Sequence, residues 1–456
     1  MLLSSGLFII KPPVLFRKLT RISIPLYTVK FKKNLCFIQV YKKVRLCYDK
    51  IGVNGEELFI LNSSEIIKKT NHFGAMNYLP KEVVIERAEG VTVYDPEGNS
   101  YYDMLSAYSA LNFGHIHPEI VAAAKSQLDK VTLTSRAFHN SVLCDFYEKL
   151  CDLTGKDTVL PMNTGAEAVE TALKTARRWG HTVKGVENGK QEIIVCKNNF
   201  HGRTITIISM STDENARMGF APYTEGFVTV PFGDAGALKS AITENTVAFL
   251  VEPIQGEAGV IVPPEGYLKE VRNICTENNV LFIADEVQTG FARTGRMFAC
   301  EHESVVPDIY VLGKALGGGI MPVSAVAANR DILGVFNPGS HGSTFGGNPL
   351  ACAVSLKAME ILVRDDYPRM AEEKGTYFMN RLKEIDNPEI IDIRGKGLLI
   401  GVEFSVDAAP YVKKLIHGGV LAKETHEHTI RFAPPVIITY EQIDAAFETI
   451  KEAFSK

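Results

Sequence analysis

The sequence lacks a strong excess of charge of either sign. Its 49 Lys and Arg residues nearly balance 53 Asp and Glu residues, which gives a formal net charge of −4. A protein that binds nucleic acid needs a basic surface, so this balance predicts no nucleic-acid partner. A chain of 456 residues is also too long for one hydrophobic core, so we expect a large enzyme with two domains.

The eight cysteines lack any Cys-x-x-Cys pair. Their scattered positions argue against a zinc site and against the disulfide framework of a secreted domain. We therefore expect reduced thiols, no bound metal and a cytoplasmic protein.

The N-terminal region lacks acidic residues and any apolar run long enough to span a bilayer. Residues 1–48 hold ten Lys or Arg residues and no Asp or Glu, and the apolar run at residues 6–10 is far too short to cross a membrane. We expect residues 1–60 to be a basic extension that is disordered or removed, and we expect no membrane partner. A mitochondrial transit peptide, which would place the protein in the matrix, is the alternative because such peptides are basic and acid-poor.

Past residue 70, short β-rich runs alternate with helical stretches. Residues 91–105 alternate apolar and polar side chains around Asp-Pro-Glu-Gly, which predicts an antiparallel hairpin, and residues 118–128 have helical spacing. An α/β domain with a mostly parallel sheet is predicted by the later β-rich runs, at 193–196, 204–209, 247–251, 280–284 and 309–312.

The expected organisation is a large α/β domain at residues 105–345 and a smaller α+β domain. The smaller domain combines residues 346–456 with an N-terminal segment, residues 61–104. Within it, residues 393–404 are predicted to form a strand of a second sheet.

Two charged residues end separate apolar runs. Asp285 follows residues 281–284, and Lys314 follows residues 310–313. Ligands of open α/β sheets bind just beyond the carboxyl ends of the strands, so these two side chains could face one ligand. The alternatives are a buried salt bridge, or surface charges that simply end their strands.

Three further segments carry polar groups that suit a ligand. Gly165 stands where a helix begins, so its amide and that of Ala166 could bind phosphate, although a plain helix cap by Thr164 is the alternative. "NNFHGRT" (198–204) sets an aromatic residue and an arginine after another predicted strand. "HGSTFGGNP" (341–349) is a Gly-rich loop with two hydroxyls, and by itself it also fits an ordinary turn.

Together these motifs resemble the fold-type I, pyridoxal-phosphate-dependent class III aminotransferases. The resemblance runs from about residue 75 to the C-terminus and rests most on the spacing from DEVQTG to GKALGGG. Within that class, "GAMNYLP", "VEPIQGEAGV" and "FARTGRMFA" are most similar to the ornithine aminotransferases. The resemblance implies a homodimer with shared active sites at the subunit interface.

The cofactor implied by the resemblance is pyridoxal 5′-phosphate. Lys314 would form the Schiff base with its aldehyde and then move a proton between substrate and cofactor. Asp285 would keep the pyridine nitrogen protonated. The other implied contacts are Val287 and Phe200 on the two ring faces, Gln288 at the phenolic oxygen, and Gly165, Ala166 and the other subunit's Thr344 at the phosphate. Simple core packing is the alternative for Phe200.

The implied reaction moves the δ-amino group of L-ornithine to 2-oxoglutarate and gives glutamate 5-semialdehyde and L-glutamate. Arg203 is expected to grip the amino-acid carboxylate, because a guanidinium binds a carboxylate through two parallel bonds. Arg431 is expected to bind the second carboxylate of 2-oxoglutarate, and Glu257 to neutralise Arg431 when ornithine is bound. Tyr78 is expected to contact the non-reacting amine, and Tyr108 to shape the substrate channel.

Other functions stay open. "FHGRT", with His201, also resembles the acetylornithine aminotransferases, so N-acetylornithine or 4-aminobutyrate is the alternative substrate within the class. A dinucleotide-binding oxidoreductase would need spaced glycines, whereas residues 317–319 are three consecutive ones. A non-catalytic member of the fold would have no need of Asp285, Gln288 and Lys314 together.

Overall fold

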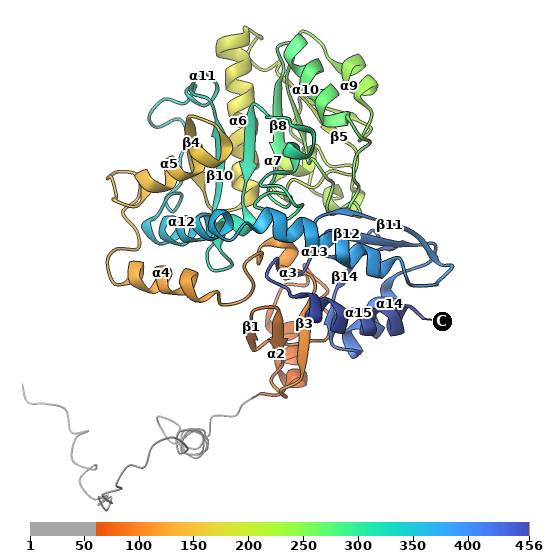
Figure 1. Cartoon of the computed structure of the whole chain (residues 1–456). Helices are drawn as coiled ribbons and strands as arrows, with labels where there is room; N and C mark the ends of the chain where they lie inside the picture. Colours follow the sequence, from red (N-terminus) through yellow and green to blue (C-terminus); the bar gives the residue numbers. More distant parts are fainter. Residues whose placement is uncertain (1–60, 456) are drawn as a thin grey trace, which may run out of the picture. The chain divides into compact units, whose positions relative to one another are not determined.

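Seven strands form the largest sheet of the computed structural model, which describes residues 61–455 (Figure 1). Strand β10 runs antiparallel to its two neighbours, β4 and β9, and the other six strands share one direction. This confirms the predicted mostly parallel sheet. In spatial order the strands are β4 (Thr158–Met162), β10 (Ser324–Ala328), β9 (Ile309–Leu312), β8 (Leu281–Asp285), β7 (Thr246–Val251), β5 (Glu192–Cys196) and β6 (Phe227–Val230).

Both faces of this sheet are buried because its strands are apolar on both sides. In β8, Leu281 and Ile283 pack in one cluster with α6 (Gly165–Trp179), while Phe282 and Ala284 pack in another cluster with α10 (Tyr267–Glu277). Strands that are covered on both faces read as continuous hydrophobic runs, as these do. The packing fixes the carboxyl ends of the strands as a rigid edge.

Two smaller sheets have four strands each. One contains β1 (Arg87–Glu89), β2 (Thr92–Tyr94), β3 (Ser100–Asp103) and β13 (Val420–Leu421), and its β2–β3 pair is the predicted antiparallel hairpin. The other contains β11 (Ile390–Lys396), β12 (Leu399–Phe404), β15 (Thr429–Phe432) and β14 (Lys423–Thr425).

The single strand predicted at residues 393–404 is wrong. The chain turns there and forms two antiparallel strands, β11 and β12. Gly397 makes the turn with a φ of 53°, where a side chain would be strained and would also meet the backbone of Thr294.

The helix predicted at residues 118–128 is confirmed as α4 (Pro118–Leu128), but the strand predicted at 204–209 is the helix α7 (Ile205–Ser209). The Thr204 hydroxyl accepts a hydrogen bond from the Ile207 amide and so caps the helix, and this overrides the β preference of the isoleucines. The remaining α-helices are α2 (Ser63–Phe73), α3 (Ser106–Ser109), α5 (Leu143–Thr154), α8 (Glu214–Arg217), α9 (Ala235–Ala241), α11 (Arg330–Leu333), α12 (Pro349–Arg364), α13 (Tyr367–Leu382), α14 (Ala409–His417) and α15 (Tyr440–Phe454).

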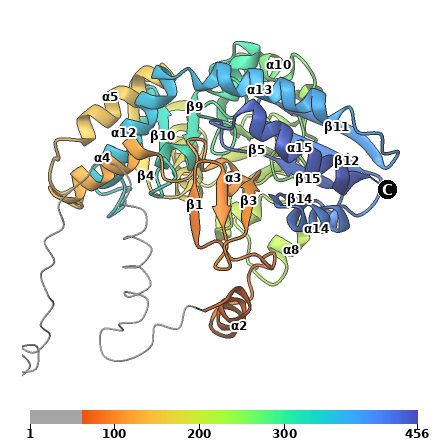
Figure 2. The same cartoon turned by 60° about the horizontal axis from the view of Figure 1, so that its bottom comes forward.

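Helices α13 and α15 lie side by side, and α13 packs on strands β11 and β12 (Figure 2). No helix within residues 61–455 is long and apolar enough to cross a membrane. The extension predicted for residues 1–60 lies outside the described residues.

Candidate active site

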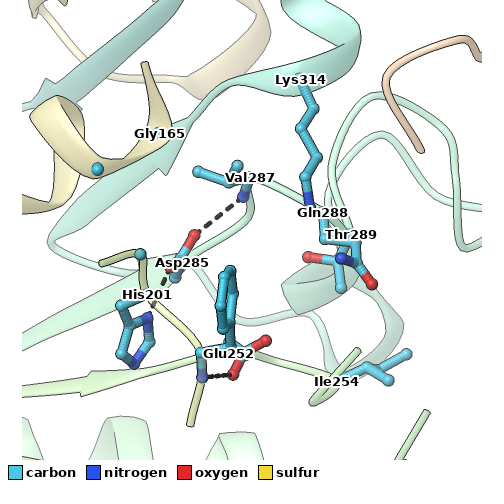
Figure 3. Close-up of a pocket in the computed structure, with 12 residues that line it drawn as sticks. Gly165, His201, Glu252, Ile254, Asp285, Val287, Gln288, Thr289 and Lys314 are labelled. Carbon is cyan, nitrogen blue, oxygen red and sulfur yellow. Dashed lines mark hydrogen bonds and ion pairs between the residues drawn. The ribbon is translucent and has the colours of Figure 1, made fainter. Parts of the chain in front are cut away.

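A cavity of about 210 Å³ opens at the carboxyl edge of the large sheet. Asp285 is the last residue of β8, and it pairs with Val311 of the neighbouring strand β9. Lys314 follows β9 by two residues, so the acid and the amine come from adjacent strands and line one cavity (Figure 3). The other lining residues are Gly165, Ala166, Phe200, His201, Gly202, Glu252, Ile254, Val287, Gln288 and Thr289.

The N-terminus of α6 forms one wall of the cavity. Thr164 and Glu167 form a capping box, in which each side chain accepts a hydrogen bond from the other residue's backbone amide. The amides of Gly165 and Ala166 are the first two of the helix and have no acceptor within it, so they suit an anion. Thr164 therefore caps the helix, as the alternative prediction had it. The cap does not use the amides of Gly165 and Ala166, so these two amides stay free to bind an anion.

Asp285 is held by two donors. His201 Nδ1 lies 2.6 Å from Asp285 Oδ2, and the Val287 amide donates to Asp285 Oδ1 at 3.1 Å. Burial alone would lower the pKa of His201, but the hydrogen bond and charge of Asp285, with Glu252, raise it. The Asp285 carboxylate is therefore fixed in direction by an imidazole and a backbone amide.

Glu252 is a second buried carboxyl group in the cavity wall. Its Oε1 accepts the Phe200 amide at 2.9 Å. Burial, together with the charge of Asp285, raises the pKa of Glu252 to about 7, although His201 and the backbone amides oppose that shift. Glu252 can therefore hold a proton at neutral pH.

Lys314 is half-buried, and its backbone is left-handed with a φ of 45°. Burial lowers the pKa of the Lys314 amine to about 8, with Arg431 adding to the shift while Glu257, Asp285 and Glu252 oppose it. At neutral pH the Lys314 amine is therefore unprotonated in a sizeable fraction of the molecules. An unprotonated amine is the form that acts as a nucleophile or takes up a proton.

Arg431 and Glu257 form an ion pair that Gln288 joins. Arg431 Nη1 donates to Glu257 Oε1 at 2.7 Å and to Gln288 Oε1 at 3.1 Å, and Gln288 Nε2 donates to Glu257 Oε1 at 3.1 Å. Burial opposes ionisation of Glu257, but the charge and hydrogen bond of Arg431, with Lys314 and Gln288, lower its pKa to about 2. The Arg431 side chain is only 2% exposed, so its charge is neutralised inside the protein.

Tyr108 covers the other side of Arg431. The Arg431 guanidinium carbon lies 5.0 Å from the centre of the Tyr108 ring, and Lys423 Nζ donates to the Tyr108 hydroxyl at 3.2 Å. Tyr108 lies in α3, a left-handed turn that costs about 1–2 kcal/mol for each residue with a side chain. The ring thus contacts two cations from a strained position.

Six of the predicted residues lie outside the cavity lining. Tyr108, Glu257 and Arg431 form the cluster described above, which contacts the lining residue Gln288, and the other three are Arg203, Thr344 and Tyr78. Arg203 is exposed, with its guanidinium carbon 5.5 Å from the centre of the Phe200 ring. Thr344 is exposed in the Gly-rich loop, and Tyr78 is 68% exposed. The structure therefore brings the residues predicted to hold the cofactor together, apart from Thr344, and leaves two of the residues predicted to hold the substrate at the surface.

The sequence interpretation missed the place of His201, Glu252 and Lys423 in the site. Glu252 comes directly after the apolar strand β7, and Asp285 ends the apolar strand β8. An acidic residue at the end of an apolar run is therefore the sequence signal that could have identified Glu252. His201 and Lys423 carry no such signal, because only folding brings them to Asp285 and Tyr108.

Known proteins resemble this chain over most of its length. The ornithine aminotransferase of Geobacillus sp. (strain WCH70) is 61% identical over 393 residues, which are 86% of this chain and 99% of that protein. The solved ornithine aminotransferase of Toxoplasma gondii, crystallised with oxidised glutathione, is 41% identical with a TM-score of 0.86, covering 93% of this chain and 98% of that one. The acetylornithine aminotransferase of Elizabethkingia anophelis is 47% identical with a TM-score of 0.79, covering 86% of this chain and 99% of that one.

A family match accounts for these similarities. Residues 73–454 match the family described as Aminotransferase class-III. The matched residues include all the strands of the large sheet and every residue that lines the cavity. With its acid and amine at the ends of adjacent strands, this chain belongs to the class-III aminotransferase family.

Proposed function

We propose that the protein is a pyridoxal-phosphate-dependent transaminase that moves the δ-amino group of L-ornithine to 2-oxoglutarate. The observation that carries the proposal is that two pairs of opposite charges lie next to each other. Asp285 and Lys314 share one cavity, and Arg431 beside them is neutralised by Glu257. The reaction needs both pairs, because ornithine presents an amine where 2-oxoglutarate presents a carboxylate.

The cavity fits pyridoxal 5′-phosphate. Gly165 and Ala166 offer free amides for the phosphate, Asp285 offers a fixed carboxylate for the ring nitrogen, and Lys314 offers an amine for the carbonyl carbon. Gly165 also leaves room, because a Cβ there would lie 3.0 Å from Val287 Cγ1. When bound, the cofactor supplies an electron sink for the carbon that loses its proton.

Lys314 is the group that moves the proton at the reacting carbon. Its pKa of about 8 allows the amine to accept a proton and to return it near neutral pH. Asp285 stabilises positive charge at the ring nitrogen, and His201 keeps the carboxylate pointed at it. Val287 and Phe200 exclude water from the two ring faces.

Substrate selection falls to the arginines and tyrosines around the cavity. Arg203 binds the carboxylate of ornithine, and Tyr78 contacts its α-amine, which keeps the δ-amine at Lys314. Glu257 neutralises Arg431 while the δ-amine is present. When 2-oxoglutarate binds, Arg431 pairs with the carboxylate next to the reacting carbon, and Glu257 must release it.

Transamination of N-acetylornithine is the second candidate. It is favoured by the 47% identity to the acetylornithine aminotransferase of Elizabethkingia anophelis and by His201 in "FHGRT". The two candidates differ at the α-nitrogen, which is a cation in ornithine and a neutral amide in the acetylated compound.

A substrate panel tests the proposal. The purified protein is assayed with ornithine, N-acetylornithine and 4-aminobutyrate as donors and 2-oxoglutarate as acceptor, with glutamate and semialdehyde as products. We expect kcat/KM for ornithine to exceed the other two by about tenfold or more, because one unpaired polar contact costs at least that factor. Equal activity on N-acetylornithine would move the assignment to the second candidate.

We also propose a homodimer in which Thr344 completes the phosphate site of the other subunit. Thr344 is exposed in the single chain, and so are large apolar residues of the chain surface, including Phe345 (54%) and Phe138 (73%). Apolar side chains this exposed suit a subunit interface.

Mixed dimers test the shared site. Lys314→Ala removes the reacting amine, whereas Thr344→Ala weakens the phosphate contact in the other subunit. In a dimer with one chain of each kind, one site regains both groups, so activity after subunit exchange should exceed the sum of the two separate variants. If the activity of the mixed dimer only equals the sum of the two separate variants, Thr344 acts in the site of its own subunit.

A further inference from the structure

Helix α3 is a left-handed turn made entirely of residues with side chains. Residues Ser106, Ala107, Tyr108 and Ser109 have φ values of 44°, 47°, 59° and 72°. Residues other than glycine rarely adopt this conformation even singly, because Cβ crowds the following carbonyl oxygen. Such strain persists only where the surroundings hold the backbone in place, and it concentrates at functional sites.

Hydrogen bonds from three directions hold the start of this turn. Asp103 Oδ1 accepts the amides of Leu105 at 3.0 Å and Ser106 at 2.8 Å. The Ser106 hydroxyl donates to the Ala433 carbonyl and accepts from Arg293 Nη2 at 3.2 Å. Ser106 is fully buried, so its own hydrogen bonds lack competition from water.

Arg293 connects the turn to the rest of the site. Its guanidinium is fully buried and donates to Asn112 Oδ1, to the Leu398 carbonyl at 2.9 Å and to the Pro434 carbonyl. Within residues 61–455, Arg293 has no carboxylate within 4.0 Å. Asn112 is buried too, and its Nδ2 donates to the Phe291 carbonyl at 2.8 Å.

This network joins the three elements that surround the Arg431 guanidinium. Tyr108 belongs to the turn, and Arg431 lies two residues before Ala433 on the segment that receives the Ser106 bond. Gln288, which bonds to Arg431, lies five residues before Arg293 on the same loop. The position of the Tyr108 ring over Arg431 is thus set through Asn112 and Arg293.

We propose that Asn112 and Arg293 are specificity-determining positioning residues, which hold the strained turn so that Tyr108 stays over Arg431 and Lys423. Neither side chain lines the cavity. They act through Tyr108 on the choice among amine substrates, and this inference rests on the proposed transaminase function. Asp285 is held in the ladder of β8 and β9, and Lys314 follows β9 by two residues.

Asn112→Ala tests the inference because it removes the Arg293 acceptor without touching the cavity. We expect KM for the preferred amine to rise and the preference over the other panel amines to fall by about tenfold, as a displaced positioning group does. The kcat value and the cofactor absorbance should stay near those of the parent protein. Asn112→Asp keeps an acceptor for Arg293 but loses the donor to the Phe291 carbonyl, so it should restore part of the preference.

Asn387→Ala is the matched control. Asn387 is also buried, and its Nδ2 donates to the Tyr411 hydroxyl at 3.1 Å and to the Phe454 carbonyl at 2.8 Å, away from the cavity. This variant should lose stability as Asn112→Ala does but keep the substrate preference. If Asn112→Ala does not fold, Asn112→Ser takes its place with the same expected result.

The inference is overturned if Asn112→Ala keeps the preference within about twofold, or if it lowers activity equally on all three amines. The proposed function is judged separately, by which amine the parent protein prefers. The change in preference between the parent protein and Asn112→Ala measures the positioning role of Asn112, whichever amine the parent protein prefers.

Discussion

His201 Nδ1 lies 2.6 Å from Asp285 Oδ2, and the two side chains are 0% and 5% exposed. A charge-assisted hydrogen bond in such a site fixes the direction of the carboxylate as well as its charge. The buried acid at the end of β8 is therefore part of a pair.

Replacing His201 should lower turnover without loss of the fold. His201→Leu removes the donor to Asp285, and we expect kcat to fall about 10- to 100-fold, since a hydrogen bond to a charged group contributes about 1.5–3 kcal/mol. His201→Asn keeps a donor at the place of Nδ1 and should retain most activity. Steady-state kinetics on both variants measures the difference, and equal loss in the two would assign His201 to packing alone.

The lowered pKa of Lys314 should determine how the rate of cofactor binding depends on pH. At a pKa of about 8, roughly a tenth of the amines are neutral at pH 7, far more than for an ordinary lysine. The rate at which cofactor-free protein captures pyridoxal phosphate should therefore rise about tenfold per pH unit up to pH 8 and then level off. Stopped-flow absorbance follows the capture, and a rate still rising at pH 10 would contradict the shift.

Glu252 should make the cofactor-free protein less stable as the pH rises. Its folded pKa of about 7 is raised, so between about pH 4.5 and 7 the folded chain keeps a proton that the unfolded chain has released. Stability contributed by this proton is lost through that window. Glu252→Gln cannot titrate, so its stability relative to the parent should grow from pH 5 to pH 8 in urea unfolding. Glu265→Gln, at an exposed position, is the control and should show no such trend.

Glu257→Ala should change which amine of ornithine reacts. Without the carboxylate, the Arg431 charge repels the δ-amine, so the α-amine should react more often while Lys314 chemistry continues. The pKa of Glu257 is lowered to about 2, so its charge is lost only in strong acid and the effect should be the same from pH 6 to pH 9. Product analysis by mass spectrometry decides, and unchanged regiochemistry counts against the switch.

The positions of Asp285 and Lys314 could be predicted because adjacent parallel strands end at one edge of a sheet. The helix at Gly165 could be predicted as well, since Thr164 and Glu167 are a local capping signal. These features depend on neighbours in the chain.

The remaining parts depend on contacts between distant segments. Lys423 reaches Tyr108 across 315 residues, and Asn112 reaches the Phe291 carbonyl across 179, so no local pattern predicts either bond. The isoleucine-rich segment 204–209 has a β preference that predicts a strand, but the capping hydroxyl of Thr204 makes it a helix. The left-handed turn at Tyr108 contains no glycine, so the sequence gives no signal of its backbone conformation.

The charged groups around the cavity lie on two different sheets. Asp285 is tied into the β8–β9 ladder, whereas Arg431 lies on β15 of a separate four-stranded sheet. Relative motion of the two sheets would leave the acid and its neighbouring amine in register while shifting the guanidinium. In the proposed function, proton transfer and substrate selection therefore rest on different sheets, so a change on β15 would alter the choice of substrate while the reacting pair stays in place.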